Sequence, residues 1–134
     1  MKCSLSVVLA GLLLMFTIPV LAHHSAGSFW YTDKNIEVQG VVQSVKIINP
    51  HPEMVIEVTE ANGQKSTWRV TGGGNASGMI RAGWKNGTLP AGMLVKVEGH
   101  PSRTEGAHTI LAGKVTTPDG KVFNFSAGSG PIDQ

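Results

Sequence analysis

Two adjacent histidines, His23 and His24, are the residues of this sequence best suited to metal chemistry. They follow Val20-Leu21-Ala22, which has the small residues that precede a signal-peptide cleavage site. Cleavage there frees the α-amine of His23, whose pKa of about 7.7–8.0 lets a metal displace its proton near neutral pH. The amine can chelate with the ring of His23, or with the amide and ring of His24, and a square of nitrogens favours Cu(II). The pattern indicates copper binding; the alternative is a merely polar start to the mature chain.

A third metal ligand could come from His51, His100 or His108. His51 stands between two prolines that force an extended corner, and a rigid corner suits a metal ligand or a recognition group. Asn49, beside it, is a candidate ligand-binding residue. The alternative is that Asn49 and His51 only hydrogen-bond the turn backbone. His100 and His108 lie at the ends of predicted strands, where surface positions are expected.

The aromatic residues suggest a second kind of site. Trp30 and Tyr31 are expected to be exposed and could form a stacking surface for a ligand. Trp68 alternates in phase with Val70, which predicts a place in the core. Trp84 is expected to close the base of the domain.

No catalytic set of residues is recognisable, so we expect a binding protein and not an enzyme. The serines lack a paired Asp-His context, and the carboxylates Glu37, Glu57, Glu60 and Glu98 are spaced as solvated groups. The triplet 72–74 lacks the Lys-Ser/Thr of a phosphate loop. Three hypotheses remain, in this order. The first is a copper-binding protein, the second is a metal-free module that binds a small polar ligand or a partner protein, and the third is a copper-dependent oxidoreductase built on the His23 amine.

The first 22 residues predict export. Lys2 gives a positive start, residues 5–18 form an uncharged apolar stretch, and Pro19 ends it. This stretch is shorter than the roughly 20 apolar residues of a spanning helix, although an uncleaved anchor is the alternative. The only cysteine, Cys3, precedes the stretch, which argues against a lipid anchor. We expect a periplasmic or secreted protein without a stable membrane anchor, with a metal ion, a small ligand or a periplasmic protein as its partner.

Charge argues against nucleic acid as a partner. Of 11 Lys+Arg residues one is Lys2, so 10 remain after cleavage against 9 Asp+Glu, a net charge of +1. Nucleic-acid binders carry a basic patch, and here the positive residues are scattered. The mature chain has no cysteine, which excludes a thiol nucleophile and a disulfide framework.

Alternating apolar residues predict an all-β domain with one short helix. A long strand over 36–48 is expected to bend or bulge at Gly40. A hairpin follows, with strands near 54–58 and 66–71 joined at Asn62-Gly63. Asn75 or Ser77 can cap a helix over 76–84, ended by Asn86-Gly87. Further strands are expected around 93–97, 110–115 and 122–125.

This order is that of the OB-fold, a five-stranded Greek-key barrel. Closure would remove the exposed edges of so small a sheet, and an open sandwich is the rival. We expect a signal peptide over 1–22, an irregular arm over 23–35, the OB-like barrel over 36–126 and a flexible tail over 127–134.

The chain also resembles the DUF6152 family of small exported bacterial proteins. The residues that carry the resemblance are Ala22-His23-His24-Ser25, Gly40-Val41-Val42 with Val45, Asn49-Pro50-His51, Trp68, Gly83-Trp84, Leu89-Pro90-Ala91-Gly92, Val95, Val97, Gly99, and residues 115–120. The resemblance implies export and a domain boundary, and no particular role. The sequence departs from the family pattern at Pro52-Glu53 and at residues 72–75. Both departures concern the ligand pocket that the family could share near these two loops.

Overall fold

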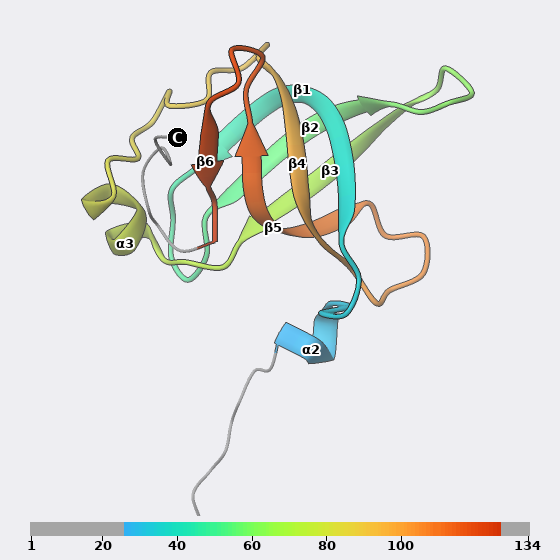
Figure 1. Cartoon of the computed structure of the whole chain (residues 1–134), viewed down its shortest axis with the longest axis horizontal. Coiled ribbons are helices and arrows are strands. Elements are labelled where there is room, and N and C mark those ends of the chain that lie inside the picture. The colour runs from blue at the N-terminus through green and yellow to red at the C-terminus, as the bar shows by residue number, and fades with distance from the viewer. Residues whose placement is uncertain (1–25, 127–134) are drawn as a thin grey trace, which may run out of the picture.

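The first strand, β1 (Ile36–Lys46), is the element that joins the two halves of the fold. Residues 36–41 pair antiparallel with β4 (Leu94–Pro101), and residues 41–46 pair antiparallel with β2 (Glu53–Thr59). The computed structural model describes residues 26–126. In this structure β1 curves strongly, so that its first half pairs with β4 and its second half with β2 (Figure 1).

The other strands close the sheet. β3 (Lys65–Gly72) pairs with β2, β5 (Thr109–Thr116) pairs with β4, and the short β6 (Val122–Asn124) lies beside β5. A parallel pairing of residues 69–72 with residues 109–112 joins β3 to β5. This closure makes a five-stranded mixed barrel with one extra strand, as expected for an OB-like fold.

The bend in β1 differs in detail from the prediction. The register shift lies between Val42 and Ser44, and the strand ends at Lys46. Gly40 instead sits just before the strand changes partners, where a Cβ would lie 2.7 Å from the carbonyl oxygen of Glu57. Glycine is needed there because β2 approaches so closely, while the bulge itself comes later along the strand.

Two short helices flank the barrel. The arm was expected to be irregular, but residues Ala26–Phe29 form the one-turn helix α2. The helix α3 (Ala76–Arg81) begins at Asn75, whose side chain accepts from the N–H of Gly78 as predicted for an N-cap. It ends earlier than predicted, because Gly83 at φ +89° turns the chain and places Trp84 beyond the helix.

The core lies inside the barrel and beneath α3. The alternating positions of the strands supply most of it, and α3 contributes Met79. Trp84 is 2% exposed and contacts Phe123 and Phe125 at centroid distances of 5.3 and 5.4 Å, so its ring belongs to the core beside β6. No helix within 26–126 is long and apolar enough to cross a membrane.

Candidate functional site

Asn49 and His51 both bind the segment that leads into α3. The Asn49 side chain accepts from the N–H of Ala76 at 3.1 Å, and Nδ1 of His51 lies 3.1 Å from the carbonyl oxygen of Gly74. A carbonyl only accepts, so Nδ1 carries the proton and Nε2 of a neutral His51 keeps its lone pair. The two residues therefore fix the loop 47–52 against α3, and His51 still presents one exposed nitrogen.

His100 is also hydrogen-bonded through Nδ1 to a backbone carbonyl, but beside the arm and not beside α3. Its Nδ1 lies 2.7 Å from the carbonyl oxygen of Lys34, so its Nε2 is the free nitrogen. The half-buried ring lines a hollow of about 200 Å³ together with Asn35, Glu98 and Lys114. A donor bond from one ring nitrogen to a backbone carbonyl is the usual support of a metal-binding histidine.

The arm is fixed to the corner between β4 and β5. Tyr31 donates its N–H to Pro101 at 3.0 Å, and Arg103 donates its N–H to Phe29 at 2.9 Å. The Arg103 guanidinium also donates through Nε to the carbonyls of Gly27 and Trp30, at 2.7 and 3.1 Å. The helix α2 is thus held near the end of β4, beside the start of β1 (Figure 1).

Trp30 and Tyr31 do not form the exposed platform that the sequence suggested. Both are half-buried. Lys34 and Arg103 lie over the Tyr31 ring, 4.0 and 4.6 Å from its centroid. The prediction of exposure was wrong because the arm folds back onto the barrel, and cation–π contacts occupy the ring that a ligand would need.

Most of this chain matches one protein family. The family of unknown function DUF6152 matches residues 11–112, which is most of the chain. The chain belongs to the DUF6152 family. No curated protein and no solved structure matches it. In this DUF6152 chain the matched range includes the arm, the His51 loop, His100 and His108.

A cluster that sequence reasoning missed lies where β3 of this DUF6152 protein meets the loop 102–108. Trp68 stacks on His108, with ring centroids 5.1 Å apart and an angle of 8° between the planes. The indole Nε1 lies 3.1 Å from Ser66 Oγ and 3.5 Å from Glu60 Oε1, and the Ser66 hydroxyl donates to Glu60. Trp68 packs against the core, as its phase with Val70 predicted, but its ring is only half-buried.

The negative charge of this cluster lies on the Glu60 carboxylate. The hydrogen bond from Ser66, then that from Trp68, lower the pKa of Glu60 below its ordinary value, and the nearby His108 acts in the same direction. His108 is exposed, and within the described residues no group hydrogen-bonds its ring nitrogens. Only the phase of Trp68 could have been read from sequence, because 40 residues separate it from His108.

Metal ligands are dispersed in the described part of the chain. Residues 26–126 contain no group of three His, Cys, Asp or Glu side chains that could hold an ion. His23 and His24 lie outside these residues, so the predicted copper site stays a prediction. The structure places His51 beside α3, whereas His100 lies beside the arm. Glu37, Glu57 and Glu98, expected to be solvated, form ion pairs with Lys96, Lys65 and Lys114.

Proposed function

We propose that this chain is an exported, non-catalytic binding protein that holds Cu(II) at its mature N-terminus, with His100 as the third ligand. The observation that supports this assignment is the anchoring of residues 27–31 to the corner at 101–103, next to His100. The apolar start of the sequence supports export, and the His23-His24 pair supports copper.

The reach of the chain favours His100 over His51. His23 precedes Ala26 by three positions, and extended chain spans at most about 10 Å over that length. Lys34, whose carbonyl orients His100, belongs to the same arm. His51 instead follows the far end of the 11-residue strand β1 and contacts Gly74. We therefore assign His100, in place of His51, as the third copper ligand beside His23 and His24.

The chemistry at the Trp68 cluster supports binding rather than catalysis. In a serine hydrolase the histidine accepts the serine proton and a carboxylate orients that histidine. Here the Ser66 hydroxyl donates directly to Glu60, and the face of His108 packs on Trp68. The Ser66 hydroxyl is thus paired with a carboxylate whose lowered pKa makes it a weak base, and His108 is not placed to accept the Ser66 proton.

Calorimetry with a competing chelator tests the copper assignment. The protein is the mature chain 23–134, compared with a variant that carries one extra residue before His23. The extension moves the amine away from the His23 ring, so we expect Cu(II) affinity to fall by about tenfold or more. Binding should also weaken as pH falls through about 6, because the ligands must lose protons.

His100→Gln and His51→Gln form a matched pair, because each removes an imidazole whose Nδ1 binds a backbone carbonyl. We expect His100→Gln to lower Cu(II) affinity about tenfold and His51→Gln to leave it unchanged. Equal affinity in the native and extended proteins would remove the amine from the site. Loss in His51→Gln alone would return the third ligand to the corner at Asn49-Pro50-His51.

A metal-free binding module is the second candidate, and the Trp68–His108 stack favours it. OB-folds bind ligands on the face of strands 2 and 3 and at the loop between strands 4 and 5. Trp68 lies in β3 and His108 in that loop. Pentoses, hexoses and nucleosides are suitable probes; saturable movement of the Trp68 indole resonance, lost in His108→Ala, would support this function.

A further inference from the structure

An apolar groove runs along the barrel wall where β4 begins, on residues that the proposed copper site does not use. Its volume is about 510 Å³, within the roughly 300–1,000 Å³ of small-molecule sites. Two turns form its sides, residues 88–93 before β4 and residues 117–121 between β5 and β6. The apolar walls are Pro90, Met93, Leu94, Pro118 and Phe123.

Leu94 is the centre of this surface. It points outward, because the next residue, Val95, is 1% exposed and fills the core. Leu94 itself is 43% exposed. It also lines a second hollow of about 260 Å³, which shares Thr117 and Pro118 with the first. One exposed leucine is ordinary, so it is the apolar hollow around Leu94, and not its exposure alone, that makes this surface a candidate binding site.

An ion pair stands on the rim of the groove. Asp119 accepts from the Thr117 hydroxyl at 2.5 Å and pairs with Lys121 at 3.0 Å, so this carboxylate already has partners. These contacts, with Thr117 first, lower the pKa of Asp119 to about 2. Lys121 remains 68% exposed.

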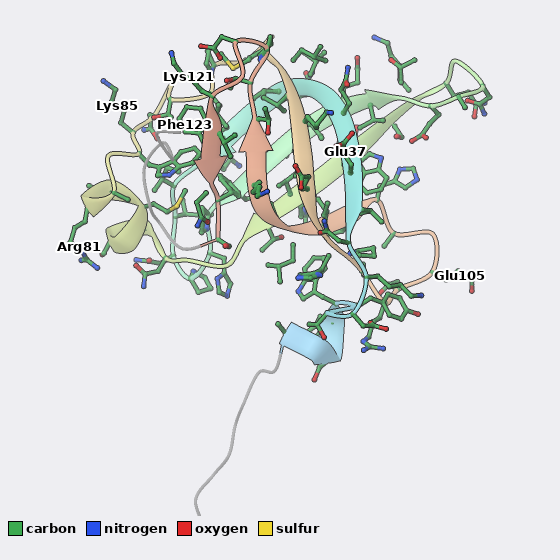
Figure 2. All side chains as sticks on the ribbon, in the orientation of Figure 1. Glu37, Arg81, Lys85, Glu105, Lys121 and Phe123 are labelled. Atoms are coloured by element: carbon green, nitrogen blue, oxygen red, sulfur yellow. The ribbon has the colours of Figure 1, made fainter. Side chains whose placement is uncertain are left out.

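A second lysine, Lys85, lies just before the opposite turn and outside the groove lining. Lys85 donates its backbone N–H to the hydroxyl of Thr88, which lines the groove, and its ammonium takes part in no ion pair within 26–126. Figure 2 shows Lys85 and Lys121 projecting outward on the same side of the barrel, beside Phe123. With Lys85 just outside the groove lining and the Asp119–Lys121 pair on it, these three side chains carry a net charge of +1.

We infer that this groove binds a single-chain amphipathic anion, with a linear apolar chain along Leu94 and a carboxylate head between Lys85 and Lys121. The groove is open, and its walls are mainly aliphatic and proline side chains because Phe123 is only 8% exposed, which suits a flexible chain better than a flat ring. Burial of the chain against Leu94 supplies most of the affinity. The lysines select the sign of the head group and add a smaller, salt-dependent contribution.

Titration of the mature protein with decanoate below its micelle concentration, followed by backbone amide resonances, tests the inference. We expect saturable shifts at residues 88–94 and 117–123. Decyltrimethylammonium has the same chain and the opposite charge, and it should bind at least roughly threefold more weakly. Failure of the copper experiment would leave this result untouched, because no histidine lines the groove.

Leu94→Asn and Ile80→Asn are matched variants, because both remove an exposed aliphatic side chain. Ile80 is 61% exposed on α3 and does not line the groove. We expect Leu94→Asn to weaken decanoate binding about tenfold and Ile80→Asn to have no effect. Equal weakening in both, or none in either, would overturn the site. Equal binding of the anion and the cation would overturn the assignment of the head group.

Discussion

Trp68 and His108 lie face to face, with centroids 5.1 Å apart and planes only 8° from parallel. The stack connects β3 to the loop 102–108, close to where the parallel pairing of β3 and β5 begins at Arg69 and Thr109. The stack and the backbone pairing therefore support the same junction, which is the one that closes the barrel.

The two tryptophans of the barrel should differ in their contribution to stability. Trp84 is 2% exposed, so Trp84→Ala should lower the free energy of unfolding by about 3–5 kcal/mol. Trp68→Ala should cost less, because part of that ring is already in contact with water. His108→Ala should cost about 0.5–1.5 kcal/mol through loss of the stack. Urea titration measures all three; a loss for Trp68→Ala as large as that for Trp84→Ala would contradict the half-buried placement.

Substitution by alanine should have a large effect on stability at Gly99 and a small one at Gly113. A Cβ at Gly99 would lie 2.1 Å from the carbonyl oxygen of Leu111, which is backbone and cannot move aside without breaking the β4–β5 register. Gly99→Ala should therefore destabilise by about 1–3 kcal/mol or more. At Gly113 the nearest atom is 3.8 Å away, so Gly113→Ala should change stability little. Similar denaturation midpoints for both variants would refute the close approach at Gly99.

Glu60 should titrate below an ordinary glutamate. Its pKa is lowered by hydrogen bonds from Ser66 and Trp68, so the ionised form supports the folded state. That support is present above the unfolded pKa and is lost as pH falls through the folded value. Carboxyl NMR should show the pKa of Glu60 rising in Ser66→Ala. Thr67→Ala, one residue along on the opposite face, is the control and should leave it unchanged.

Export predicts a definite mass. If the proposal of export is right, cleavage after Ala22 should give a protein of residues 23–134, because the charged start, apolar stretch and small residues before His23 have the pattern of a signal peptide. Intact mass spectrometry of the periplasmic fraction measures this directly. A mass that retains Met1, or a start beyond His24, would leave copper without its amine ligand.

The sequence by itself determined the local elements. Alternation of apolar residues identified the strands, Asn62-Gly63 located the β2–β3 hairpin, and Asn75 capped α3. These features depend on contacts within a few residues, so neighbouring side chains suffice to predict them. The resulting order of strands and helix was enough to indicate an OB-like barrel.

Tertiary structure alone decided which of these residues meet. A period of two places Trp68 on the inner face, but only the pairing of β3 with β5 decides that its ring reaches the barrel edge and stacks on His108. Tyr31 is half-buried because Arg103, 72 residues away, draws the arm onto the β4–β5 corner. The groove at Leu94 arises where two separate turns face one another. Such contacts depend on how the sheet closes, and closure is set by all strands together and by no single segment.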